Sequence, residues 1–353
     1  MSSSSRRLLL GLALLVCLTA PAARVSAQQA QGFALDRFYP SPAGAGWFVM
    51  DDLDMHGGLG GALALTTGYA RNPLRLEDGI QQLAVVSSEA FVNFGLAATY
   101  DRWRVYLDLR MPLLIAGQSG TIGGAIYTSP RTMLTSSPPT FSDRVTLASN
   151  PDTLSDPRVG VEGRLFGAAG GRFRLGLAAE LIAPNGERSA YVTDGTFQAM
   201  IRALTAGDVG RLRYAAQLGV HIRPLDEASI PGSPQGSELL FGAAGGARVA
   251  ECGHGSMALV VGPEIYGATA FRSFFGSTTT AVEGLLTARL EGTAPHGPQL
   301  RLRLGAGGGI NQDFGAPEWR VLAAIEVFNR NVEPVSVQGT PTQSGRQTNT
   351  PPQ

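Results

Sequence analysis

The stretch Arg211–Arg223 alternates apolar and polar side chains along its whole length. The apolar residues of one parity are Leu212, Tyr214, Ala216, Leu218, Val220 and Ile222. A period of two places alternate residues on opposite faces of a β-strand, whereas a helix would scatter the arginines of this stretch around its circumference. A tilted strand crosses a hydrocarbon core in about 9–11 residues. The stretch therefore predicts a strand long enough to span a membrane.

The same alternation recurs along the chain and predicts twelve strands. They cover residues 57–69, 89–100, 103–113, 158–166, 172–181, 196–206, 211–223, 237–249, 257–270, 280–290, 300–311 and 319–328, and a continuation of the first strand through Leu76 stays open. Short connections alternate with longer ones, of which residues 117–156 form the longest. An even strand number with short turns at one end and longer loops at the other is typical of bacterial outer-membrane barrels. We therefore expect an all-β fold, a transmembrane antiparallel up-and-down β-barrel with both termini in the periplasm.

The N-terminal residues have the layout of a cleaved secretory signal peptide. Arg6 and Arg7 precede an apolar run, and small residues at Val25-Ser26-Ala27 offer a cleavage site. No run of about 20 apolar residues follows, so no membrane helix is expected. The expected division is a signal peptide at 1–27, a periplasmic lead-in at 28–56, the barrel at 57–328 and a disordered periplasmic tail at 329–353.

The part from Gly32 to Asp54 does not alternate regularly. It contains Phe33, Phe38, Tyr39, Trp47 and Phe48 among prolines and glycines. Two interpretations stay open from the residues alone. The part is either a lead-in outside the barrel or a segment that lies in the barrel mouth.

Several function classes are disfavoured by composition and motifs. The formal net charge is zero, which gives no general attraction to nucleic acid. Gly305–Gly309 lacks the Gly-Lys-Ser/Thr of a phosphate loop, and the four histidines share no metal-ligand spacing, so neither a cofactor nor a metal is expected. His221 is expected to be a hydrogen-bonded side chain of the lumen. No strand carries a lipid-facing serine with a histidine, so an enzyme is not expected.

The inward-facing charges separate by sign along the barrel axis. Because the strands alternate in direction, the position of a charge in its strand fixes its height. The arginines gather near the periplasmic mouth. The glutamates lie near the outer mouth, with Glu264 above the middle and Glu326 as the main exception. The predicted pore-lining residues are Arg104, Arg164, Arg174, Arg213, Arg248, Arg289, Arg303, Glu180, Glu238, Glu264 and Glu283.

Two interpretations of these charges compete. In the first, the charges are buried ion pairs that fill and stiffen the barrel, with carboxylates such as Glu162, Glu180 and Glu264 bound to arginines. In the second, the arginines form a basic constriction in a pore. Rings of arginine favour anions in pores, and few carboxylates are expected at the height of the arginines. The strand number does not decide between them, because eight strands are filled by side chains and sixteen enclose an aqueous channel.

Several turn and strand motifs resemble the barrel region of OmpA-type outer-membrane proteins of myxobacteria. They include Phe38-Tyr39-Pro40-Ser41, Asp51-Asp52-Leu53, Ala206-Gly207-Asp208-Val209-Gly210, Val261-Gly262-Pro263-Glu264-Ile265-Tyr266-Gly267 and Phe314-Gly315-Ala316-Pro317. The resemblance covers about residues 32–328 and implies an outer-membrane barrel. Members of that family commonly carry a C-terminal peptidoglycan-binding domain, and the residues after Phe328 show no sign of one.

The expected function is that of a structural barrel or a passive, porin-like channel for small solutes, with anions favoured by the arginines. Its expected partners are outer-membrane lipid, lipopolysaccharide and the barrel-assembly machinery, with no nucleic acid. Two alternatives stay open. One is an outer-membrane enzyme of the lipase or protease kind, and the other is a surface-binding protein that acts through loop 117–156.

Overall fold

The computed structural model describes most of the chain between Gln28 and Asn331. The described residues are 28–29, 32–77, 81–122, 125–127, 154–225, 235–253, 256–294, 296–311 and 315–331. The predicted signal peptide, the predicted tail from residue 332 onward and residues 128–153 of the predicted long loop lie outside them.

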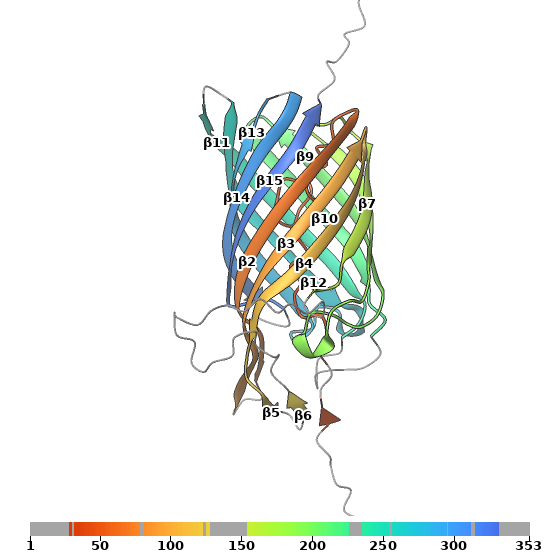
Figure 1. Ribbon diagram of the computed structural model, residues 1–353, viewed down its shortest axis with the longest axis vertical. Coiled ribbons are helices and arrows are strands. Elements are labelled where there is room, and N and C mark those ends of the chain that lie inside the picture. Colours follow the sequence, from red (N-terminus) through yellow and green to blue (C-terminus); the bar gives the residue numbers. More distant parts are fainter. Residues whose placement is uncertain are drawn as a thin grey trace, which may run out of the picture.

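Twelve antiparallel strands close into one barrel (Figure 1). Its strands are β2 (Leu59–Glu77), β3 (Gln82–Tyr100), β4 (Trp103–Ala116), β7 (Arg158–Phe166), β8 (Arg174–Ile182), β9 (Gln198–Val209), β10 (Leu212–Ile222), β11 (Glu238–Cys252), β12 (Met257–Ala270), β13 (Thr280–Gly292), β14 (His296–Asn311) and β15 (Trp319–Asn331). Neighbours in sequence pair with one another, and β15 pairs with β2 to close the barrel. The predicted fold class is confirmed.

The strand bounds agree with the predicted ones to within a few residues, except at the first hairpin. There the strands β2 and β3 run on as a paired extension beyond the rest of the barrel, to Glu77 and Gln82. The alternation breaks in this part because the register shifts at Arg71 and again at Leu74. A period-two pattern cannot be followed through such a shift, so the sequence predicts shorter strands here.

The two faces of the wall differ as the alternation predicts. Along β8, every second side chain is buried and the others are exposed. Leu175, Leu177 and Leu181 are exposed on the outside, while Arg174 and Glu180 are buried on the inside. The barrel thus has an apolar outer surface and a charged interior. Among the described residues, no helix is both long and apolar enough to cross a membrane.

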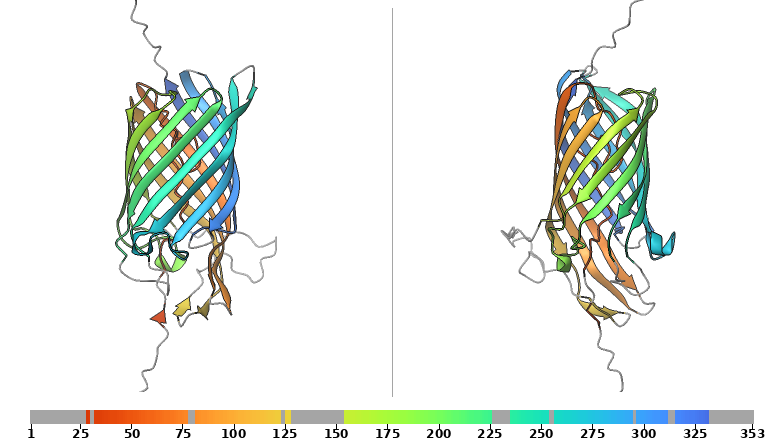
Figure 2. Two further views of the ribbon diagram at one scale, coloured as in Figure 1. Left: turned by 180° about the vertical axis from the view of Figure 1, so that it is seen from behind. Right: turned by 90° about the vertical axis from the view of Figure 1, so that its right-hand side faces the viewer.

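The two ends of the barrel are built differently (Figure 2). At the short-turn end, connections such as Asp101–Arg102 and Gly210–Arg211 join neighbouring strands. The long-loop end carries the β2–β3 extension and the 3-10 helices η2 (Arg188–Ala190) and η3 (Phe271–Ser273). It also carries a small sheet of β1 (Gln28–Gln29), β6 (Ala125–Tyr127) and β5 (Gly120–Ile122), in that order.

Residues 32–56, here called the lumen segment, run through the inside of the barrel. Near the long-loop end, the backbone N–H of Leu35 donates to the carbonyl of Tyr191 at 3.1 Å. Near the short-turn end, the N–H of Gly170 donates to the carboxylate of Asp54 at 2.9 Å. Of the two interpretations of this part, the structure shows the one inside the barrel, and the expected lead-in outside the barrel is corrected.

The two ends of the described chain therefore lie at opposite ends of the barrel. Gln28 and Gln29 pair with β6 at the long-loop end. Asn331 pairs with His296 at the short-turn end. Within the described residues, this arrangement differs from the expectation that both termini lie on the same side, because the lumen segment crosses the barrel before β2 begins.

Candidate functional site

Aromatic side chains of the lumen segment form the centre of the barrel interior. Phe38, Trp47 and Phe48 are buried and belong to one apolar cluster with side chains of the wall. Arginines of the wall lie against their rings. The guanidinium carbon of Arg289 is 4.7 Å from the ring centroid of Trp47, and that of Arg303 is 5.2 Å from Phe48. Such contacts let a buried arginine keep a favourable electrostatic partner on its flat face.

A compact double turn positions the acidic residues of the segment. The N–H of Ser41 donates to the carbonyl of Phe48 at 2.8 Å, and that of Asp52 donates to Ala45 at 2.9 Å. Gly46 has a φ of +99°, and a Cβ there would lie 2.2 Å from Asp52 Oδ2. Only glycine fits this position without strain. The turn directs two adjacent aspartates toward the wall.

Asp51 binds Arg104, the first of the seven predicted pore-lining arginines, which are here called the collar. Its Oδ2 accepts a hydrogen bond from Arg104 at 2.6 Å, and Arg104 also donates to Glu162. All three side chains are almost fully buried. The expectation of few carboxylates at this height is wrong, because Asp51, Asp52 and Asp54 come from a part of the chain that the strand pattern does not place.

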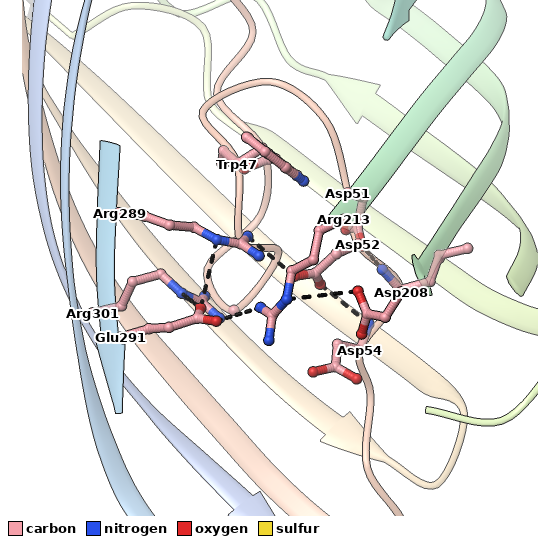
Figure 3. A network of polar contacts seen from close by, with 12 residues as sticks. Trp47, Asp51, Asp52, Asp54, Asp208, Arg213, Arg289, Glu291 and Arg301 are labelled. Carbon is pink, nitrogen blue, oxygen red and sulfur yellow. Dashed lines mark hydrogen bonds and ion pairs between the residues drawn. The ribbon is translucent and has the colours of Figure 1, made fainter. Parts of the chain in front are cut away.

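Asp52 extends the network to the opposite wall (Figure 3). Its Oδ2 lies 3.4 Å from Arg289, whose Nε lies 3.7 Å from Glu291. Glu291 also accepts hydrogen bonds from Arg301, at 2.9 Å, and from Arg213. The lumen segment and the wall thus share one continuous set of ion pairs.

Other predicted pore-lining arginines hold the segment by its backbone or lie at the rim. Arg303 donates to the carbonyl of Trp47, and Arg164 donates to those of Leu53 and Met55 at 3.2 and 2.7 Å. Arg174 lies 3.4 Å from Asp208 of the wall. Arg248 is a third exposed and pairs with the exposed Glu251, so it stands apart from the network.

Two of the predicted glutamates bind in different ways. Glu180 is paired with Arg158 and Arg202 at 3.3 and 3.4 Å, as expected. Glu264 accepts hydrogen bonds from the backbone N–H groups of Phe48 and Val49 at 3.0 and 2.9 Å. For Glu264 the expected arginine partner is replaced by the backbone of the lumen segment.

The remaining two glutamates lie toward the long-loop end and also reach the segment. Glu238 is paired with Arg37 of the segment at 2.8 Å. Glu283 pairs at 2.7 Å with Arg320, which in turn binds Asp36 of the segment at 2.8 Å. The segment therefore contributes both signs of charge to the interior.

The mouth of the barrel at the long-loop end is closed around the start of the segment. Asp194, in the β8–β9 connection, accepts the N–H of Ala34 at 2.8 Å and two hydrogen bonds from Arg223 at 2.7 and 2.8 Å. A cavity of about 70 Å³ lies beside Asp36 and Tyr39. It has room for about two water molecules.

The predicted pore-lining side chains do not border an open pore in this conformation. All of them except Arg213 and Arg248 are buried, and most bind the lumen segment or its partners. His221 is buried as well, and its Nε2 lies 2.7 Å from Gln198, which confirms the hydrogen-bonded lumen position. Within the described part of the chain, no group of His, Cys, Asp or Glu side chains could hold a metal ion.

Comparisons with known proteins give structural likenesses only. No protein-family model and no curated protein matches the chain. The structure is similar to an outer-membrane channel from Pseudomonas putida F1, with 12% identity, coverage of 79% of this chain and 97% of that one, and a TM-score of 0.46. It is also similar to the NanC porin, with 8% identity, 76% and 99% coverage and a TM-score of 0.42. A third likeness is the CymD monoaromatic hydrocarbon channel, with 8% identity, 80% and 90% coverage and a TM-score of 0.36.

Proposed function

We propose that this protein is an outer-membrane β-barrel channel that its own lumen segment keeps closed at rest. The exposed leucines of β8 and their equivalents on the other strands support insertion into lipid. A soluble protein rarely exposes so large a continuous apolar surface. The predicted signal peptide supports export across the inner membrane.

Aromatic residues near both ends of the outer surface support the same placement. Tyr100 and Trp103 are exposed at the short-turn end. Trp319 is exposed near the long-loop end, with its ring 5.2 Å from that of Tyr69. Aromatic girdles at the two lipid interfaces are a feature of such barrels, whose longer loops face the outside of the cell. The long-loop end is accordingly assigned to the cell surface and the short-turn end to the periplasm.

Burial of the lumen segment is the observation that supports a closed channel. Asp51 and Arg104 are almost fully buried where a pore would need water. Because the wall is charged, water could solvate it once the segment moved aside. The barrel would then act as a passive channel for small solutes. Its surroundings are outer-membrane lipid with lipopolysaccharide, and its insertion depends on the barrel-assembly machinery.

Recording the ionic current through the protein in a planar bilayer can test this function with two variants. One, the release variant, weakens the ties of the lumen segment to the wall, and the other, the lock, holds the segment in place with a disulfide. The release variant, Asp51→Asn with Asp52→Asn, removes two of the carboxylates that tie the segment to the wall. The lock places cysteines at Ala43 and Gly95. A Cβ at Gly95 would lie 3.5 Å from that of Ala43, within the separation of about 3.5–4.5 Å that a disulfide needs.

The wild type is expected to stay closed, and the release variant is expected to show channel openings. Oxidation of the lock within the release variant should abolish the openings, and a reductant should restore them. Asp101→Asn, which alters an exposed ion pair with Arg102, is the matched control and should stay closed. Steady openings of the wild type that an oxidised lock leaves unchanged would contradict the proposal. A folded release variant that never conducts would instead leave a purely structural barrel.

A further inference from the structure

The wall of the barrel binds the backbone of the lumen segment along its whole length. Near the long-loop end, Arg223 donates to the carbonyl of Ala34 at 3.3 Å. Farther along, Arg158 donates to Pro40 at 3.0 Å, and near the short-turn end Arg164 donates to Met55 at 2.7 Å. The wall therefore recognises peptide groups as well as particular side chains.

Both hydrogen-bonding groups of the peptide are recognised. Glu264 accepts the N–H groups of Phe48 and Val49, while Arg303 donates to the preceding carbonyl, that of Trp47. Buried peptide groups need such partners, since an unpaired one costs free energy comparable to a lost hydrogen bond. An interior adapted only to small ions would not need acceptors for N–H groups and donors for carbonyls in register with one chain.

The direction of the segment is fixed at both of its ends. At the long-loop end, Phe33 and Leu35 are buried in an apolar cluster that includes Leu74 of β2 and Tyr191 of the β8–β9 connection. At the short-turn end, β2 begins at Leu59, opposite Tyr100. Any residue of the mature chain that precedes the segment therefore emerges at the long-loop end.

We infer that the lumen is a binding site for a polypeptide segment, and that it presents the N-terminal end of the chain at the cell surface. The occupant of this site is the protein's own residues 32–56. The inference rests on the proposed outer-membrane placement, in which the long-loop end faces outward. It assigns the two ends of the chain to opposite sides of the membrane.

Labelling of single cysteines on intact Gram-negative cells tests the direction. Each variant is the full chain with Cys252→Ser, treated with a maleimide that does not cross membranes. Gln29→Cys reports the N-terminal end. Ser277→Cys, exposed in the β12–β13 loop, reports the long-loop end, and Arg211→Cys, exposed in the β9–β10 turn, reports the short-turn end. The double variant Ala43→Cys with Gly95→Cys tests whether the segment lies in the lumen, because its disulfide can form only when residue 43 lies beside residue 95 of the wall.

Gln29→Cys and Ser277→Cys should be labelled on intact cells, Arg211→Cys only after permeabilisation, and the disulfide should form. Labelling of Gln29→Cys only after permeabilisation, with Ser277→Cys labelled before it, would overturn the inference and leave the channel proposal standing. Surface labelling of Gln29→Cys without the disulfide would refute the lumen as the site. Labelling of Arg211→Cys but not Ser277→Cys on intact cells would invert the barrel, and would overturn both the proposed placement and the inference.

Discussion

The carboxylate of Glu264 accepts a hydrogen bond from the backbone N–H of Phe48 at 3.0 Å. It accepts two more, from Val49 and from the hydroxyl of Thr287 at 2.6 Å. One side chain of β12 thus fixes the middle of the lumen segment. The contact lies between parts of the chain more than 200 residues apart in sequence.

Glu264→Gln should destabilise the protein by about 1.5–3 kcal/mol, the value of one hydrogen bond to a charged group. The glutamine amide would direct its NH₂ group at a backbone N–H of Phe48 or Val49, where the carboxylate oxygen of Glu264 accepts a hydrogen bond. Urea titration of the protein in lipid vesicles, followed by tryptophan fluorescence, measures the effect. Glu318→Gln is the matched control, since Glu318 is a third exposed and pairs with the similarly exposed Arg75. Equal stability of the two variants would show that Glu264 does not fix the segment.

The strands could be predicted from the sequence because the residues of a strand alone determine which of its side chains face the lumen and which face outward. The parity of Arg174, Glu180 and Leu177 follows from a period of two, and no distant residue has to be known. The heights of the arginines follow from strand direction in the same way. This local information is sufficient for the wall of the barrel and for the side chains that face its interior.

The occupancy of the interior could not be predicted in the same way. The lumen segment has no regular period, because its backbone turns twice and its hydrogen bonds go to distant strands. Two signals nevertheless point to it. Phe33, Phe38, Trp47 and Phe48 are too many large aromatics for an exposed lead-in, and Asp51-Asp52 complements the arginines of the collar, for which the strand pattern predicts few carboxylates. Together these two signals favour a segment inside the barrel.

The buried ion pair between Asp51 and Arg104 should matter far more than an exposed one. Asp51→Asn leaves Arg104 with one carboxylate instead of two, and loss of one partner of a buried pair typically costs about 3–5 kcal/mol. The remaining contact with Glu162 should keep the loss at or below the lower end of that range. The Asp101–Arg102 pair is more than half exposed, so Asp101→Asn should cost about 0–1 kcal/mol. The urea concentrations at which half of each variant is unfolded, measured in the same vesicles, compare the two losses of stability. Equal shifts of the two midpoints would show that the Asp51–Arg104 pair is not buried in the membrane-inserted protein.

The outer surface predicts a dependence on depth in the bilayer. Leu218 is exposed in the middle of β10, where Leu218→Arg should cost about 2–4 kcal/mol. Leu212 is exposed at the short-turn end of the same strand, where Leu212→Arg should cost about 0–1 kcal/mol. The yield of folded protein in vesicles ranks the two variants. It is measured on gels, because the folded barrel migrates differently from the unfolded chain when the sample is not boiled. Gln217, on the inner face, is a poorer control because it accepts a hydrogen bond from Arg202.

Closure of the long-loop mouth should weaken in acid. Burial raises the pKa of Asp194, but the guanidinium of Arg223 and the hydrogen bonds from Arg223 and Ala34 lower it more, so that the pKa lies below its ordinary value. A lowered pKa in the folded state means that the carboxylate stabilises the closed mouth fully above about pH 3.9, the unfolded value. This contribution is lost as the pH falls through the lower folded value.

Protease cleavage within residues 32–35 should therefore increase only below about pH 4. An acid-active protease applied across this pH range measures it. Asp194→Asn, which cannot ionise, should show the increased cleavage already at neutral pH and no step in acid. A step that persists in Asp194→Asn would assign the acid response to other groups.

The open state of the proposed channel should prefer anions. When the lumen segment leaves, Asp51, Asp52 and Asp54 leave with it. The short-turn half of the wall then carries Arg104, Arg164, Arg174, Arg213, Arg289, Arg301 and Arg303 against Glu162, Asp208, Glu291 and Glu326. This excess of arginine stays charged at all relevant pH values, and arginine rings favour anions in pores.

Reversal potentials of the release variant in a salt gradient measure this preference. It should weaken at high salt, because the Debye length falls from about 10 Å at 0.1 M to about 3 Å at 1 M. Adding Arg174→Gln, Arg213→Gln and Arg303→Gln to the release variant should reduce or reverse it. Arg248→Gln is the matched control, because Arg248 lies at the rim and pairs with Glu251. A cation preference that these substitutions leave unchanged would show that the collar does not line the open path.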